Sequence, residues 1–250
     1  MLERVAVLSD IHGVLPALEA VLAEPDVRTA DRIVLTGDLA SGPQPTEVLD
    51  LLTGLGDRAV WLRGNADREL LEYRREGRRQ MPDTVSPWAA GQLRPDHLDL
   101  LESLPLTREL AVAGLGQVLF CHAVPGDDEE VVLVDSALDR WQEALGGVAE
   151  EIRTVVFGHT HMPFVRLAHG RLVVNPGSVG MPYGMPGAHW ALLGPGVTLR
   201  RTDYDIEAAI AQVTECSGFE EAAEWAGYFL RARASDAEAL AVFGPRDPNR

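Results

Sequence analysis

The chain has 250 residues, of which 46% are hydrophobic, and its formal net charge at pH 7 is −16. This charge argues against a broad nucleic-acid-binding surface, because contacts to phosphates need clustered basic side chains. The sequence contains no lysine, so it has neither a P-loop lysine nor a Schiff-base lysine. Its two cysteines, Cys121 and Cys216, are too few for a disulfide framework.

The N-terminal residues run directly into an apolar strand pattern and lack the basic and long apolar regions of a signal peptide. No apolar run approaches the ~20 residues that a membrane-spanning helix needs. We therefore expect a cytoplasmic protein without a membrane partner. A homo-oligomer is compatible with these features.

In the first 62 residues, short apolar runs alternate with segments of helical spacing. Buried strands are predicted at residues 4–8, 33–35 and 59–62, with helices at 15–23 and 46–52. This alternation predicts βαβ units and a mostly parallel sheet.

The rest of the chain reads as helices, then strands, then helices again. Residues 67–104 are predicted to be mostly helical, and their arginine pairs at 74–75 and 78–79 are interpreted as solvated helix surface. A helix is predicted at 131–145 and helical structure from 205 to about 242. Strands are predicted at 110–112, 118–120, 154–157, 164–168, 172–174, 188–193 and 197–202.

Two runs of strands with helices before, between and after them predict an α/β fold. The expected architecture is a four-layer αββα sandwich, in which two stacked mixed sheets are flanked by helices. Residues 1–204 are expected to form this domain, and residues 205–250 a helical C-terminal extension packed on it.

Polar residues follow five of the predicted strands. Ligands in such folds bind at the carboxyl ends of strands, and side chains two positions apart share a face in extended chain. Carboxylate and amide oxygens together with imidazoles suit divalent cations. The five segments are Asp10-Ile11-His12, Gly37-Asp38, Gly64-Asn65, Cys121-His122 and Gly158-His159-Thr160-His161.

Each segment alone has an ordinary structural explanation. A lone Asp or His at a strand end commonly forms a turn, Asp38 could cap a helix, and Asn65 suits a left-handed turn. The whole set, with each member beyond a strand, is far more specific. It suits two metal ions bridged by one carboxylate, an arrangement that stabilises both the attacking and the leaving oxygens in phosphoryl transfer.

With these motifs, and with the segment 175–180, residues 3 to about 202 resemble the calcineurin-like metallophosphoesterase superfamily, best its small bacterial and archaeal phosphodiesterase branch. The resemblance implies two divalent metal ions and a hydroxide between them that attacks phosphorus in line. It also implies catalytic roles for Asp38 and His122. The implied ligands are Asp10, His12 and His161 for one metal, Asn65, His122 and His159 for the other, and Asp38 as the bridge.

One position departs from the pattern of many relatives. These carry a histidine directly after the Gly-Asn pair, where it can donate a proton to the leaving oxygen. This chain has Ala66 there, so no general acid is assigned. The next residue, Asp67, either orients a ligand or is an ordinary acidic residue in the first turn of a helix.

The expected function is a dinuclear metal-dependent phosphoesterase that hydrolyses a small phosphodiester or a nucleotide-type phosphate. Ligand hardness favours Mn²⁺, with Fe, Zn²⁺ and Ni²⁺ as alternatives. The alternative enzymes are a dinucleoside polyphosphate hydrolase and a protein phosphatase. A non-catalytic metal-binding interaction module is the alternative from another class, and Ala66 is the feature that favours it.

Several further residues lie outside the ligand set. Three histidines, His97, His169 and His189, match no ligand position and are expected at the surface or in a hairpin. Cys121 is expected to be a small core residue. Arg63 is expected to contact either a phosphate or a carboxylate, and the segment 175–180 to form either a phosphate-binding loop or a turn between strands.

Overall fold

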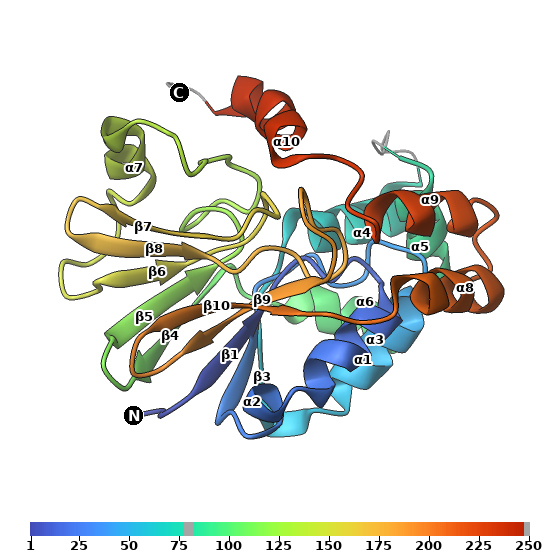
Figure 1. The fold of residues 1–250 in the computed structure, drawn as a ribbon, viewed down its shortest axis with the longest axis horizontal. Helices are drawn as coiled ribbons and strands as arrows, with labels where there is room; N and C mark the ends of the chain where they lie inside the picture. The colour runs from blue at the N-terminus through green and yellow to red at the C-terminus, as the bar shows by residue number, and fades with distance from the viewer. Residues whose placement is uncertain (78–82, 248–250) are drawn as a thin grey trace.

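The computed structural model describes residues 1–77 and 83–247, and two five-stranded sheets lie face to face at its centre (Figure 1). The first sheet has the strand order β10-β9-β1-β2-β3. Strands β1, β2 and β3 run parallel, while β9 and β10 are antiparallel to their neighbours. The strands of this sheet are β1 (Val5–Leu8), β2 (Arg32–Leu35), β3 (Ala59–Trp61), β9 (Ala188–Leu193) and β10 (Val197–Thr202).

The second sheet has the order β4-β5-β6-β8-β7. Its three inner strands β5, β6 and β8 are parallel, and each edge strand is antiparallel to its neighbour. The strands of this sheet are β4 (Thr107–Val112), β5 (Gly116–Cys121), β6 (Thr154–Val156), β7 (Phe164–Ala168) and β8 (Arg171–Asn175).

Alternating side chains of each strand divide the core between the layers. In β1, Val5 and Val7 point toward the second sheet and pack in one cluster with residues such as Phe120 and Val174. The alternate residues of the strand, such as Leu8, point toward the helices that cover the first sheet. This period of two, with both faces apolar, is what a strand buried on both sides requires.

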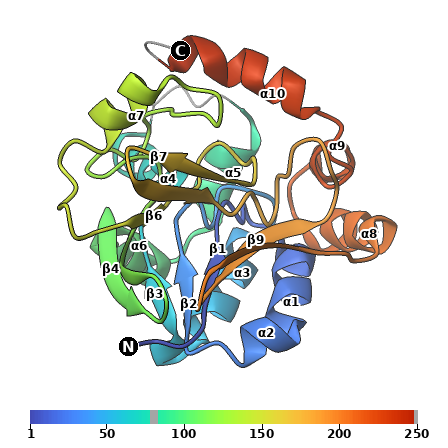
Figure 2. The same ribbon diagram turned by 60° about the vertical axis from the view of Figure 1, so that its left-hand side comes forward.

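Helices cover both outer faces, which confirms the predicted four-layer α/β architecture (Figures 1 and 2). One outer layer is thick and lies against the first sheet. The other is thin and contains α7 (Figure 1). The helices before the C-terminal part are α1 (Leu15–Ala23), α2 (Pro25–Arg28), α3 (Pro45–Thr53), α4 (Asn65–Glu76), α5 (Val85–Gln92), α6 (Pro95–Ser103) and α7 (Leu138–Ala144), with a 3₁₀ turn η1 (Gly56–Arg58).

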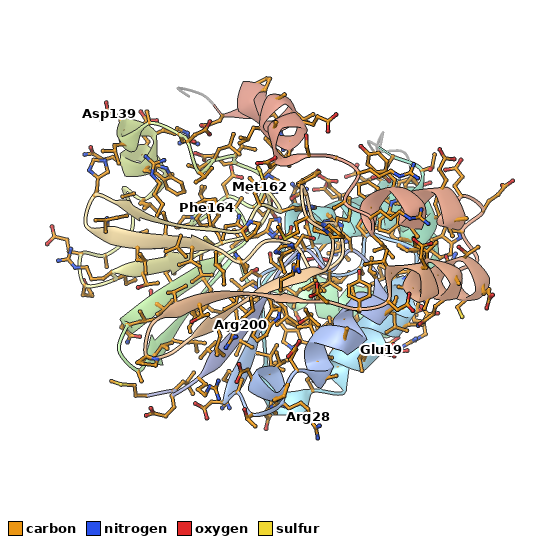
Figure 3. The ribbon with its side chains drawn as sticks, viewed as in Figure 1. Glu19, Arg28, Asp139, Met162, Phe164 and Arg200 are labelled. Carbon is orange, nitrogen blue, oxygen red and sulfur yellow. The ribbon has the colours of Figure 1, made fainter. Side chains whose placement is uncertain are left out.

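The helix predicted at 131–145 is only half present. It begins at Leu138, and residues 131–137 are irregular. Val131 and Leu133 are buried against Met162 and Phe243 instead of continuing a helix. Figure 3 labels Met162 of this cluster. Adjacent β-branched valines disfavour a helix, and the Ser136 hydroxyl accepts a hydrogen bond from the Leu133 N–H, so side-chain bonding competes with helix formation here.

The C-terminal helices are α8 (Ile206–Cys216), α9 (Ala222–Phe229) and α10 (Asp236–Phe243), followed by a 3₁₀ turn η2 (Gly244–Arg246). Helices α8 and α9 pack into the core of the first sheet's helical layer, through residues such as Val213 and Ala226. Helix α10 then crosses toward α7 (Figure 1). Among residues 1–77 and 83–247 there is no helix whose length and apolar character together would let it span a membrane.

The predicted helical segment 67–104 contains α4, α5 and α6 within its described part. Arg74 and Arg75 lie exposed near the end of α4, and Arg75 forms an ion pair with Glu102, as expected of solvated helix surface. The second arginine pair, Arg78 and Arg79, lies outside the described residues.

Candidate metal centre

The carboxyl ends of strands from both sheets meet at one end of the sandwich. There the side chains of Asp10, His12, Asp38 and His161 come together, with one ligand-type atom from each lying within 4.8 Å of the others. Asp38, His122 and His159 form a second group by the same measure. Asp38 belongs to both groups, so its carboxylate lies between them. All these side chains are buried.

Asn65 joins the second group through His122. The Asn65 Oδ1 atom lies 3.1 Å from His122 Nε2. The structure therefore brings all seven sequence-predicted residues together. Two members of the first group, His12 and His161, have Nε2 atoms 3.2 Å apart although 149 positions separate them in the chain.

The backbone is strained at most of these positions. Asp10, His12, Asp38, His159 and His161 all have positive φ, between 48° and 66°, in the left-handed region that side chains other than Gly rarely adopt. Each lies in the sharp turn that follows a strand, so the turn directs its side chain into the centre.

Gly64 allows one of these turns to approach another. A Cβ atom at Gly64 would lie 2.1 Å from Asp38 Oδ1 and 2.4 Å from the Asp38 nitrogen. Only glycine fits there, because these atoms belong to a buried and rigid part of the site. The Gly-Asn motif thus serves close packing as well as placing Asn65.

Backbone carbonyls hold three of the histidines in one tautomer. The Nδ1–H groups of His12, His122 and His161 donate to the carbonyl oxygens of Ser41, Thr36 and Met181, at 3.1, 2.8 and 2.8 Å. A carbonyl oxygen only accepts, so each Nδ1 carries a proton and each Nε2 points into the centre, where it offers a lone pair to a cation once it carries no proton of its own. Partners of this kind orient the imidazole ligands of metal ions in proteins.

Two buried atoms in the centre form no hydrogen bond. They are His159 Nε2 and Asp10 Oδ1, and the second of these has only an ion-pair contact with His161 Nε2, at 3.2 Å. In addition, His12 Nε2 and His161 Nε2 lie 3.2 Å apart, so both ring nitrogens point into the same space. Buried polar groups are normally satisfied, and cations between these atoms would satisfy them. The residues therefore fit bound metal ions.

The charges of the centre shift the pKa values of its members in opposite directions. Burial opposes ionisation of Asp38, but His122 and His12 outweigh burial and hold the pKa of this carboxyl well below its usual value. Burial would lower the pKa of His122, but the Asp38 carboxylate raises it to about 10. Burial and the charge on His122 lower the pKa of His159 to about 3.

Asp67 ties two of the loops together. It is the third residue of α4, and its carboxylate accepts hydrogen bonds from the backbone N–H groups of Asp38, Leu39 and Gly64, at 2.9, 2.9 and 3.0 Å. Asp67 is therefore an acidic residue in the first turn of a helix and also a residue that holds the loop of the candidate ligand Asp38. Burial and the nearby Asp38 raise the pKa of this carboxyl to about 7.

The segment 175–180 is a turn that supports the centre. It links β8 of one sheet to β9 of the other. The Val179 and Gly180 N–H groups donate to the carbonyl oxygens of Ser9 and Asp10, so these groups are already used within the protein. This favours the interpretation as a turn between strands over a phosphate-binding loop.

The remaining histidines are only partly as expected. His169 is exposed in the β7–β8 hairpin, as predicted. The surface prediction is wrong for His97, which is buried beside Asp50, and for His189, which is buried with Nε2 3.1 Å from the Met185 carbonyl oxygen. Each ring has a hydrogen-bond partner at Nε2, distant in sequence for His97 and in a turn for His189, whereas the Nδ1 atom of His97 has none.

Two other residues near the centre have definite structural roles. Cys121 is buried in the core as expected, and burial raises its pKa to about 12. Arg63 forms an ion pair with Asp128, whose Oδ2 lies 3.3 Å from the Arg63 Nε. Of the two expectations for Arg63, a carboxylate contact is the one that the structure contains.

A pocket of about 200 Å³ opens beside the metal centre. His12, Asp38 and Asn65 lie in its wall, so a molecule bound there reaches the candidate metal ligands. Ala66, which the sequence had singled out, also lies in the wall. The sequence contained no signal for the remaining wall residues, which are Ser41, Glu69, Asp83, Val85, Ser86, Met181, Trp225 and Phe229.

Residues 4–194 match the calcineurin-like phosphoesterase superfamily domain, and the chain belongs to this family. It is 26% identical to the phosphodiesterase YfcE of Escherichia coli over 218 residues, which cover 81% of this chain and 95% of that protein. It is 30% identical over 192 residues to a symmetrical bis(5′-nucleosyl)-tetraphosphatase of Aliivibrio fischeri, covering 66% and 69% of the two chains.

A solved structure agrees with this assignment. The crystal structure of a metallophosphoesterase from Sphaerobacter thermophilus superimposes with a TM-score of 0.70 at 26% identity, covering 92% of this chain and 100% of the other. The chain is accordingly a metal-dependent phosphoric ester hydrolase.

Proposed function

We propose that this protein is a dinuclear phosphoesterase that hydrolyses a phosphodiester or a nucleotide-type phosphate. The observation that carries the proposal is Asp38, whose carboxylate is shared by two separate groups of ligand-type side chains. In this assignment Asp38 would be the ligand shared by the two ions. Asp10, His12 and His161 would hold one ion, and Asn65, His122 and His159 would hold the other.

Two divalent ions in such a site supply a nucleophile at neutral pH and stabilise charge on the attacking and leaving oxygens. The protein's own contribution is to hold the ligands in place before substrate binds. The carbonyl oxygens of Thr36, Ser41 and Met181 orient three imidazoles, and Asp67 holds the loop that carries Asp38. Mn²⁺ is the first choice of metal on ligand hardness.

A metal titration followed by a panel of phosphoesters tests this function. Protein purified without chelator should bind up to two Mn²⁺ ions per chain and hydrolyse bis(p-nitrophenyl) phosphate only when metal is present. Failure to bind Mn²⁺ and the other candidate metals would refute the dinuclear proposal.

The same panel separates the two substrate classes suggested by the relatives. A dinucleoside tetraphosphate is included because one relative is a tetraphosphatase. Higher kcat/KM for the simple diester than for the tetraphosphate supports the phosphodiesterase assignment, and the reverse order supports the polyphosphate hydrolase.

A further inference from the structure

The pocket beside the metal centre has one wall that comes from outside the family domain. The match to the family ends at residue 194, whereas α9 spans Ala222–Phe229. Trp225 and Phe229 of this helix line the same pocket as His12 and Asp38. The C-terminal helices therefore contribute side chains next to the candidate metal ligands.

The two aromatic residues form a continuous apolar surface. Their ring centroids lie 4.8 Å apart with an interplanar angle of 48°, and both side chains are half-buried, so part of each ring remains accessible. Val85 and Met181 add apolar surface to the same pocket. A flat aromatic group gains most from such a surface, because rings stack on rings and bury apolar area at the same time.

The polar part of the wall disfavours a second phosphate. Besides Asp38, Glu69 and Asp83 line the pocket, and both are acidic, while Ser41 and Ser86 contribute hydroxyl groups. Among the described lining residues, these carboxylates would repel an additional phosphate but would accept hydrogen bonds from an uncharged group.

The size of the pocket points the same way. At about 200 Å³ it is smaller than the roughly 300–1,000 Å³ typical of pockets that enclose drug-sized ligands. It therefore encloses one group of ring size next to the phosphate, rather than a long chain or a second nucleotide.

We propose that Trp225 and Phe229 select substrates in which the phosphate carries an uncharged planar aromatic group. This inference rests on the proposed function of the metal centre and names its substrate class. The C-terminal helices thus act as a specificity element of the enzyme, and α9 binds the organic part of the ester while the metal centre binds its phosphate.

Two phosphonates of different substituent test the proposal directly. Phenylphosphonate and methylphosphonate share the anionic group and are not hydrolysed as esters, so calorimetric titration of the Mn²⁺-loaded enzyme compares only the substituents. Wild type should bind phenylphosphonate roughly 10-fold or more tightly than methylphosphonate, as expected of aromatic stacking. The Trp225→Ala/Phe229→Ala double variant should lose this preference and keep its affinity for methylphosphonate.

Further variants distinguish the loss of the aromatic surface from the loss of the folded structure. Trp225→Phe keeps an aromatic ring and should retain most of the preference. Val242→Ala changes an exposed position on α10 and should behave as wild type. If the double variant does not fold, Phe229→Ala alone tests the proposal and should lose a smaller part of the preference for phenylphosphonate. The affinities for a nucleoside 5′-monophosphate and for ribose 5-phosphate are then compared. Tighter binding of the nucleotide indicates that the pocket binds a nucleobase, and equal binding indicates that it binds a ring attached directly to the phosphate.

The possible failures of the two proposals differ. Equal binding of both phosphonates by wild type, or an unchanged preference in the double variant, would refute the proposed role of Trp225 and Phe229. This holds even if bis(p-nitrophenyl) phosphate is hydrolysed. Absence of hydrolysis alongside a preference that depends on Trp225 and Phe229 would instead contradict the proposed function and leave the pocket assignment supported.

Discussion

At the scale of single residues, backbone strain is concentrated where ligand-type side chains lie. Five of the seven have left-handed φ, a conformation that costs roughly 1–3 kcal/mol for residues other than Gly. The surrounding hydrogen bonds maintain it. For example, the Asp38 and Leu39 N–H groups bond to Asp67, so Asp38 cannot relax without leaving these donors unpaired in the core.

Replacing Asp38 by Asn should have a larger effect than replacing one outer ligand. The bridging charge would be lost from both metals, and several kcal/mol of charge stabilisation corresponds to a fall in kcat of about 10³-fold or more. His161→Ala should leave one site partly filled and retain measurable activity. The comparison is kcat at saturating Mn²⁺, with His169→Ala as a surface control. Near-normal activity of Asp38→Asn would show that another residue bridges.

Ala66 should make the enzyme sensitive to its leaving group. The residue lines the pocket, and it has no group that could protonate a departing oxygen. General acid catalysis typically contributes ~10²–10⁴-fold, and the deficit is largest for basic leaving groups. Across aryl esters of rising leaving-group pKa, the rate of wild type should fall steeply, and that of Ala66→His less steeply. A flat wild-type series, with chemistry rate-limiting, would indicate that another residue donates the proton.

Metal binding should release a proton from His122 and strengthen as pH rises. The raised pKa of about 10 means that the metal-free protein holds this proton at pH 7, and the metal must displace it. Apparent affinity should therefore rise about tenfold per pH unit for each displaced proton until pH approaches that pKa. Calorimetry in buffers of different ionisation enthalpy measures the released protons.

Two variants at the second metal group provide the comparison. His122→Gln should release one proton fewer. His159→Ala should bind metal more weakly with unchanged proton release, because the lowered pKa of His159, about 3, leaves it neutral at pH 7. Equal proton release by wild type and His122→Gln would contradict the assignment.

At the scale of elements, the C-terminal segment is held at both of its ends. Helix α9 packs into the helical layer of the first sheet, and Asp247 after η2 pairs with Arg140 of α7, with Arg140 Nε 3.0 Å from Asp247 Oδ1. Asp247 also accepts a hydrogen bond from Ser136. Between these anchors, the ring of Phe243 packs edge-on against His159 at a centroid distance of 6.0 Å. Helix α10 thus lies over one side of the metal centre.

Arg140→Ala should loosen α10 and η2 locally. Both partners of the pair are buried, so the substitution leaves the Asp247 carboxylate without its cation. Losing hydrogen bonds to charged groups should raise amide exchange in residues 236–247 by roughly 10- to 100-fold. Arg231→Ala breaks an exposed pair with Glu207 and serves as the control. Unchanged exchange in Arg140→Ala would mean that apolar packing alone holds α10.

At the scale of the whole molecule, the candidate metal centre joins the two sheets. Asp10, Asp38 and Asn65 follow strands of the first sheet, while His122 and the pair His159 and His161 follow strands of the second. Ions held between these loops would bind the folded chain and not the unfolded chain, so metal binding should stabilise the entire sandwich.

Removing metal should therefore lower the melting temperature of the whole protein. Free metal at 100 times its Kd stabilises the native state by about 2.7 kcal/mol. In a chain of this size that corresponds to a fall of roughly 5–10 °C on chelation. Scanning calorimetry with Mn²⁺ or with chelator measures it, and the shift should be much smaller in Asp38→Asn. An equal shift in that variant would place the stabilising ions elsewhere.

The sequence by itself determined the strands, the polar residues that follow them and the chemistry these residues can support. These features are local: the apolar runs 4–8, 33–35 and 154–157 mark buried strands, and the residues directly after them emerge at the same edge of a sheet. The motif order also identified the family. Strand order, and the contact of His12 with His161, depended on pairing between distant segments, which only the folded chain specifies.

The tertiary structure alone decided which polar groups are buried and what covers the pocket. His97 and His189 are buried because distant or turn residues form hydrogen bonds with their rings. Residues 131–137 do not form the predicted helix because this segment packs under α10. Likewise, nothing local to Trp225 and Phe229 distinguishes them from ordinary core residues of an amphipathic helix. Their position beside the metal centre follows from how α9 docks, and docking is set by long-range packing rather than by the local pattern.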